Sequence, residues 1–168
     1  RRELEETNIG SNALSIRYAV VKLASNVFCD LEGRKALLIG AGETGKLVAA
    51  ALRSTGVREL IIANRTSARS DELACELGGA TVDFDSIQDV LGEVDIVITA
   101  TEAPEYIISR SMVEHALELP RPDRPLFIFD LAIPRDVEPS SGNLPNVKLF
   151  NIDNLASIAK DNQRKRQS

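Results

Sequence analysis

The chain has 168 residues, which is enough for one domain with a sizeable apolar core. Hydrophobic residues make up 43% and charged residues 27%, a composition that excludes a disordered chain, and no apolar stretch reaches the ~20 residues that span a bilayer. The net charge of -5 excludes bulk electrostatic binding of nucleic acid by the body of the domain.

The first thirty residues carry one long apolar pattern. Its members recur at alternating steps of three and four: Ala13, Ile16, Val20, Leu23 and Val27. This spacing predicts a helix of about four turns, with Ser11 or Asn12 as the cap at its start. We expect the helix to pack on the sheet of its own domain, with its N-terminal part reaching toward a neighbouring domain. A surface for a partner is the alternative.

From residue 31 onward the pattern changes to an alternation of strands and helices. Apolar runs predict strands at 35–39, 59–63, 80–84, 94–100, 126–131 and 147–152, with helices at 44–54, 67–77, 86–91 and 109–117. Most of the apolar runs are continuous, as is typical of parallel strands buried on both faces. The sequence therefore predicts an α/β fold, a doubly wound parallel sheet of the Rossmann type with an added N-terminal helix.

A glycine-rich turn follows the first predicted strand and opens a helix. Its residues are Gly40, Ala41, Gly42, Glu43, Thr44 and Gly45. In this pattern the first glycine makes the turn, the second admits a pyrophosphate and the third lets the helix approach the sheet. The turn predicts dinucleotide binding at the helix N-terminus, and a purely structural turn is the alternative.

The end of the second predicted strand indicates which dinucleotide binds. NAD-binding domains usually place an acidic residue there, for the ribose 2'-hydroxyl. This chain has Asn64, Arg65 and Thr66, with Arg69 one helical turn beyond Arg65. A guanidinium can hold a phosphate through two parallel charge-assisted hydrogen bonds, so the pattern favours NADP. A helix cap at Thr66 with solvated arginines is the alternative.

Together these motifs resemble glutamyl-tRNA reductase. The matching segments run in order along the chain: 15–21, 40–45, 64–66, 95–101, 130–136 and 151–155. The Asn-Arg-Thr element also occurs in shikimate dehydrogenases, whereas the segment from Asp130 to Asp136 is much more specific. The chain departs from the family's pattern at Asp153-Asn154 and at Ala100-Thr101. Both departures concern the fine positioning of the nicotinamide.

The resemblance implies one part of a three-domain enzyme. In that family a cysteine of an N-terminal domain attacks glutamyl-tRNA, and NADPH reduces the thioester to glutamate-1-semialdehyde for tetrapyrrole (porphyrin) biosynthesis. We expect 1–30 to link to that catalytic domain, 31–159 to be the NADP-binding domain and 160–168 to start a dimerisation helix. Implied partners are glutamyl-tRNA, a second copy, and the next enzyme, glutamate-1-semialdehyde aminomutase.

No catalytic residue is expected in this chain. Cys29 and Cys75 match no nucleophile segment of the family, so we interpret them as small packing residues of a protein kept in a reducing, cytoplasmic compartment. His115 is the only histidine, which excludes a multi-histidine metal site. Since the first residue is Arg1 and not Met, we expect a piece of a longer protein.

The remaining candidate residues follow two later strands, where ligands of such sheets bind. The segment after the fourth strand is expected near the nicotinamide ribose, with a simple turn as the alternative: Thr99, Ala100, Thr101, Ala103 and Pro104. Asp130, Pro134, Arg135 and Asp136 are expected to face the substrate or a neighbouring domain, with a structural ion pair as the alternative. Two other functions stay open: a shikimate-dehydrogenase-like NADP-binding oxidoreductase domain, and a non-catalytic nucleotide-binding module.

Overall fold

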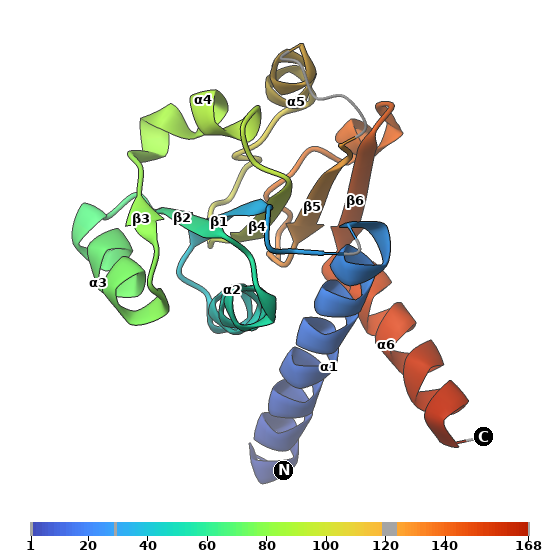
Figure 1. Cartoon of the computed structure of the whole chain (residues 1–168). Coiled ribbons are helices and arrows are strands. Elements are labelled where there is room, and N and C mark those ends of the chain that lie inside the picture. The colour runs from blue at the N-terminus through green and yellow to red at the C-terminus, as the bar shows by residue number, and fades with distance from the viewer. Residues whose placement is uncertain (1, 29, 119–123, 168) are drawn as a thin grey trace.

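The computed structural model describes residues 2–28, 30–118 and 124–167. Within these ranges, six parallel strands form one sheet in the order β3-β2-β1-β4-β5-β6 (Figure 1). The strands are β1 (Lys35–Gly40), β2 (Glu59–Ala63), β3 (Ala80–Thr81), β4 (Ile96–Ala100), β5 (Leu126–Asp130) and β6 (Val147–Asn151). The order reverses between β1 and β4, which is the doubly wound arrangement that the sequence predicts.

The central strands are largely apolar because helices cover both faces of the sheet. Leu38 of β1 belongs to one core cluster, whereas its neighbours Leu37 and Ile39 belong to the other. All three side chains are fully buried. The continuous apolar runs are therefore two alternating faces that are both covered.

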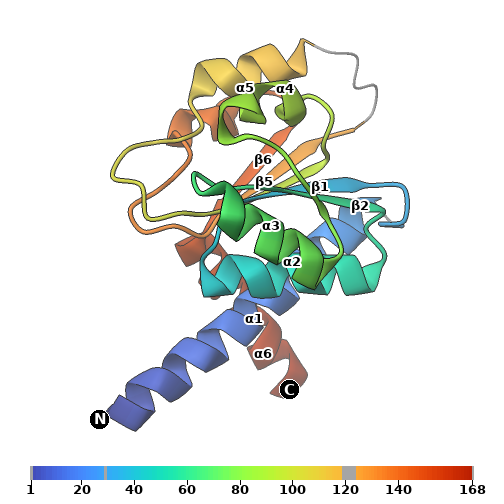
Figure 2. The same ribbon diagram turned by 90° about the vertical axis from the view of Figure 1, so that its left-hand side faces the viewer.

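In the part of the chain that the structure describes, four helices lie on one face of the sheet, and two shorter ones lie on the other (Figures 1 and 2). The first group is α1 (Arg2–Phe28), α2 (Glu43–Thr55), α3 (Ser67–Leu77) and α6 (Ile152–Gln167). The second is α4 (Ile87–Leu91) and α5 (Arg110–Leu117), with the 3₁₀ turns η1 (Phe84–Ser86) and η2 (Pro139–Asn143). The N-terminal part of α1 and the C-terminal part of α6 extend away from the sheet (Figure 1).

Helix α1 shares the core of the sheet. Its residues Ile16, Val20 and Ala24 are buried in the same cluster as α2 and β5, and α1 also contacts α6. At its end the Phe28 ring meets Phe127 of β5 edge to face, with 5.6 Å between centroids. Helix α1 therefore packs on the sheet of its own domain, as the sequence predicts.

Three predicted boundaries differ from the structure by more than two residues. Helix α1 begins at Arg2, not at Ser11 or Asn12, because no proline interrupts the segment and one interior glycine costs only ~1 kcal/mol. Strand β3 is confined to 80–81, since the chain turns into η1 soon afterwards. Helix α6 starts at Ile152, well before residue 160, because Asn151 and Asn154 exchange side-chain to backbone hydrogen bonds of 2.8 and 3.0 Å at its start.

Two of the residues discussed for their chemistry can be placed. Cys75 lies exposed on α3, so its interpretation as a packing residue was wrong: it falls on the solvent side of an amphipathic helix. Cys29 lies outside the described residues. His115 is exposed on α5, and its Nδ1 lies 3.4 Å from Glu118.

None of the described helices has both the length and the apolar character needed to cross a membrane.

Candidate functional site

A cavity of about 530 Å³ opens where β1 and β4 end, at the point where the strand order reverses. Four segments of the described chain line it: the glycine turn after β1, the turn after β2, the start of η1, and the loop after β4. The lining residues are Gly40, Ala41, Gly42, Asn64, Arg65, Phe84, Ala100, Thr101, Glu102, Ala103 and Pro104. The structure thus brings together most of the residues predicted to bind a dinucleotide.

The glycine turn lies directly against the end of β4. Gly40 has a φ of +101°, and a Cβ there would lie 2.5 Å from the Ala100 carbonyl oxygen. A Cβ on Gly45 would lie 2.6 Å from the Cβ of Ala100. Only glycine fits at either residue, because the first needs a left-handed backbone and the second faces fixed backbone-linked atoms. The third glycine therefore has the predicted role of bringing helix and sheet together.

Helix α2 begins immediately after this turn. Gly42 is its N-cap, and the Gly42 amide donates to the Ala100 carbonyl at 3.1 Å. The amides of the first turn, from Glu43 through Gly45, point out of a helix N-terminus, which carries a partial positive charge. Such a terminus beside a cavity suits a phosphate group. Glu43 itself is exposed and does not line the cavity.

At the end of β2 only two of the four predicted residues line the cavity. The Asn64 side chain accepts a hydrogen bond from the Arg65 amide at 2.8 Å. The Arg65 guanidinium lies over the Phe84 ring, 4.5 Å from its centroid. Thr66 occupies the N-cap of α3, but its side chain makes no capping hydrogen bond. Arg69 is paired with Glu72 at 3.0 Å on the exposed side of α3.

The residues at the end of β4 divide between the cavity and the interior. Ala100 and Thr101 line the cavity. Thr99 is fully buried and donates through its hydroxyl to Asp130 at 3.1 Å, so its side chain does not reach the cavity. Thr101 donates to Asp136 through both its amide, at 3.0 Å, and its hydroxyl.

The two aspartates after β5 are buried and organise the loop from within. Asp130 accepts hydrogen bonds from the amides of Ala132, Asp136 and Val137, at 3.0 to 3.2 Å. Burial raises the pKa of Asp136 above its usual value, the hydrogen bonds from Thr101 oppose that rise, and Asp130 adds to it. The side chains of Asp130 and Asp136 hold the loops after β4 and β5 together and do not face the solvent.

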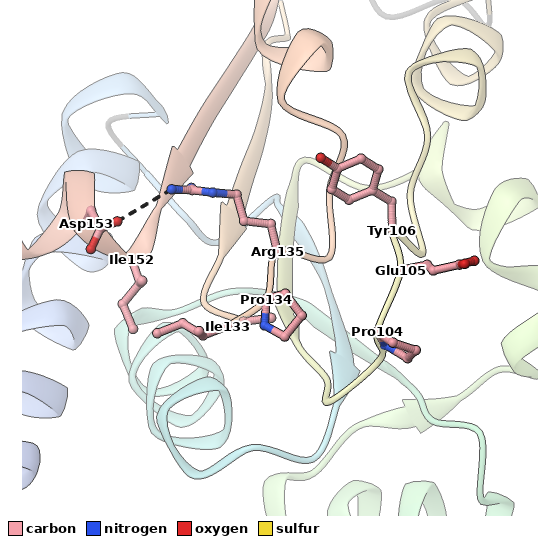
Figure 3. A pocket seen from close by; sticks show the side chains of 9 residues that line it. Pro104, Glu105, Tyr106, Ile133, Pro134, Arg135, Ile152 and Asp153 are labelled. Atoms are coloured by element: carbon pink, nitrogen blue, oxygen red, sulfur yellow. Dashed lines mark hydrogen bonds and ion pairs between the residues drawn. The ribbon is translucent and has the colours of Figure 1, made fainter.

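Arg135 and Pro134 lie in a second cavity, of about 850 Å³, which adjoins the first at Pro104. Its wall is formed by the loop after β4, the loop after β5 and the start of α6 (Figure 3). The sequence suggested an ion pair between Arg135 and Asp136, but in the structure Arg135 pairs with Asp153 instead. Its Nη2 lies 3.5 Å from Asp153 (Figure 3). Ile133 is 79% exposed at this wall, so the surface is partly apolar.

The described residues contain no group of three or more histidine, cysteine, aspartate or glutamate side chains that could hold a metal ion. Besides Glu102, the sequence interpretation missed one aromatic lining residue, Phe84. Its predicted place in a strand concealed it, although an aromatic residue one strand over from Arg65 was visible in the sequence.

A parallel sheet of this order, with a glycine turn and a helix N-terminus at the crevice between β1 and β4, defines a Rossmann-type nucleotide-binding domain. The predicted fold class is confirmed. By sequence, the chain belongs to the family described as shikimate / quinate 5-dehydrogenase, whose model matches residues 22–158.

The predicted resemblance to glutamyl-tRNA reductases is confirmed by comparison with known proteins. The glutamyl-tRNA reductase of Maridesulfovibrio salexigens is 43% identical over 167 residues, which are 99% of this chain and 38% of that protein. The solved glutamyl-tRNA reductase of Methanopyrus kandleri matches 90% of this chain and 38% of its own, with 41% identity and a TM-score of 0.86. The chain thus spans less than two fifths of the length of each of these two relatives.

A separately solved nucleotide-binding domain of glutamyl-tRNA reductase from Thermoplasma volcanium has the same fold. It covers 91% of this chain and 96% of its own, at 23% identity and a TM-score of 0.68.

Proposed function

We propose that this chain is the NADPH-binding domain of a glutamyl-tRNA reductase. The observation that carries the proposal is a single cavity lined by a glycine turn before a helix N-terminus and by Arg65 from the next strand. The turn suits a pyrophosphate and the guanidinium suits a ribose 2'-phosphate. The identity of 43% along nearly the whole chain supports the assignment to this enzyme among the dehydrogenases that share the fold.

Each part of the cofactor has a place in this proposal. The diphosphate lies at Gly40, Ala41 and Gly42, next to the first-turn amides of α2. The adenosine ribose phosphate lies at Asn64 and Arg65. The nicotinamide ribose lies beside Ala100 and Thr101, and Pro134 and Arg135 face the substrate from the adjoining cavity.

The activity of the whole protein belongs to the proposal as well. It is the NADPH-dependent reduction of glutamyl-tRNA to glutamate-1-semialdehyde in tetrapyrrole biosynthesis, in the cytoplasm. The partners would be glutamyl-tRNA, a second copy of the protein, and glutamate-1-semialdehyde aminomutase. Within this chain, 31–159 would bind the cofactor, 1–30 would lead from the catalytic domain and 160–168 toward the dimerisation domain.

The family model favours a second candidate, the NADP-binding domain of a shikimate-dehydrogenase-like oxidoreductase. Both candidates bind the same cofactor through the same cavity, so cofactor binding does not separate them. In the full-length protein, NADPH oxidation that depends on glutamyl-tRNA supports the first, and NADP reduction that depends on shikimate supports the second.

The cofactor proposal is tested by titrating the chain with NADPH and with NADH and following nicotinamide fluorescence. We expect tighter binding of NADPH. Arg65→Ala removes a charged hydrogen-bond donor worth about 1.5–3 kcal/mol, so NADPH binding should weaken by roughly 10- to 150-fold while NADH binding changes little. Arg69→Ala is the matched control, because Arg69 is already paired with Glu72 and does not line the cavity. A wild-type preference for NADH would contradict the proposal.

A further inference from the structure

We propose that Phe84 strengthens the preference for a 2'-phosphorylated dinucleotide by holding the Arg65 guanidinium in position. This inference rests on the proposed function of the cavity. It assigns a role to a residue that does not belong to the glycine turn or to the Asn64-Arg65-Thr66 segment, and that lies on the neighbouring strand connection.

The geometry of the pair is that of a cation stacked on an aromatic face. The central carbon of the Arg65 guanidinium lies 4.5 Å from the centroid of the Phe84 ring, and both residues line the cavity. Arg65 comes from the turn after β2 and Phe84 from η1, which follows β3. The contact therefore forms only because β2 and β3 are neighbours in the sheet.

Phe84 is a partly buried support for a long, exposed side chain. Its half-buried ring packs against the core cluster that contains Ile61, Ala63 and Ile87. Arg65 is exposed, and a long exposed side chain loses rotamer freedom when it binds a ligand. A ring that already restricts the guanidinium lowers this loss before the cofactor arrives.

The way in which Arg65 is held leaves its hydrogen-bond donors available. Stacking uses the face of the guanidinium, whereas its N–H groups lie in the plane and point outward. Among the described residues, no ion pair to Arg65 is found, although Arg69 and Lys46 are paired with glutamates at 3.0 and 2.8 Å. A carboxylate partner would compete with an incoming phosphate, and an aromatic ring does not.

The position of Arg65 in the cavity distinguishes a role in binding the 2'-phosphate from a role in binding the part that NADPH and NADH share. Among the described residues that line it, Arg65 is the only cation, and Glu102 is an anion on the loop after β4. A guanidinium held on the β2 and β3 side, away from the glycine turn, serves the phosphate of the adenosine ribose. The contribution of Phe84 should therefore be seen with NADPH and not with NADH.

The test compares dissociation constants for NADPH and NADH in four versions of the chain: wild type, Phe84→Leu, Phe84→Tyr and Arg65→Ala. Phe84→Leu keeps an apolar side chain but removes the ring. We expect it to weaken NADPH binding about two- to fivefold, the equivalent of ~0.5–1 kcal/mol for an exposed cation–π contact, with NADH binding unchanged. Phe84→Tyr keeps the aromatic face and should retain the wild-type ratio.

The double variant Arg65→Ala with Phe84→Leu should bind NADPH no more weakly than Arg65→Ala alone, because the ring acts through the guanidinium. Equal weakening of both cofactors by Phe84→Leu would overturn the inference and indicate a contact with the part that they share. An unchanged NADPH constant would overturn it as well. If Arg65→Ala lowers the preference and Phe84→Leu does not, only this inference fails, whereas no effect of Arg65→Ala removes the phosphate site itself.

Discussion

Buried carboxylates show at the scale of single residues how the loops around the candidate site are fixed. Asp136 accepts from the Thr101 amide and hydroxyl, and Thr101 lines the cavity. Asp130 in turn accepts from the Asp136 and Val137 amides. The cavity wall after β4 is thus set by a residue thirty-five places further along the chain.

The raised pKa of Asp136 predicts a pH-dependent stability. Because the folded chain holds this proton more tightly than the unfolded chain, its contribution is fully present below ~pH 3.9 and is lost as the pH rises through the raised native pKa. The Asp136→Asn variant has no carboxyl group to ionise at this position, so it does not lose stability in this way as the pH rises. The free energy of unfolding of the variant, measured by urea denaturation relative to the wild type, should therefore improve as the pH is raised from 4 toward neutrality.

Asp89→Asn, which removes an exposed carboxylate on α4, is the control for loss of one charge. A gap between wild type and Asp136→Asn that stays constant or widens with pH would contradict the prediction.

At the scale of elements, the helices differ in how their first turns are satisfied. Ser109 is the N-cap of α5, and its hydroxyl accepts from the Met112 amide at 3.2 Å. Thr66 has the same place before α3 but makes no such bond. The Thr66 side chain is thus not used to cap α3, whereas the Ser109 side chain caps α5.

The two caps give a matched pair of variants. Ser109→Ala should lower the free energy of unfolding by ~1 kcal/mol, because an unpaired amide is left at the helix start. Thr66→Ala should lower it by clearly less. Urea denaturation of the two variants measures this difference, and equal losses would show that the Thr66 hydroxyl caps α3 in solution.

At the scale of the whole molecule, α1 and α6 are parts of the core on one face of the sheet, although they lie at opposite ends of the chain. Leu155 of α6 is buried in the same cluster as Val20 and Ala24 of α1. The Phe127, Phe129 and Phe150 rings stack beneath them, with centroids 5.8 to 6.1 Å apart. The nucleotide-binding sheet therefore depends on both terminal helices for one of its covered faces.

Variants on α1 test this dependence. Val20 is fully buried and Val27 is 46% exposed on the same helix. Val20→Ala should lower the free energy of unfolding by about 1–3 kcal/mol, from lost burial and an unfilled cavity, and Val27→Ala by much less. Similar small effects of both, in thermal or urea unfolding, would mean that α1 is not packed on the sheet in solution.

Local pattern was sufficient for most of the fold. The apolar runs of β1, β2 and β5 and the glycine stops after α2 and α3 identify these elements because their periodicity and backbone demands are properties of a few neighbouring residues. The early start of α1 was missed, since its N-terminal part lacks the apolar pattern of the rest. Residues 82–84 were predicted as strand, but β3 ends at Thr81 and the chain enters η1 at Phe84.

The sequence by itself determined the parallel sheet, the glycine turn and the arginine after the second strand, since each depends on residue type at short spacing. Only the tertiary structure decided which candidates share a cavity. It places Arg65 with Phe84 and Thr101 there, buries Thr99, Asp130 and Asp136, and leaves Arg69 on the outside. The reason is physical: whether a polar side chain faces a cavity or the interior depends on the packing of strands that are far apart in the chain, which no local pattern records.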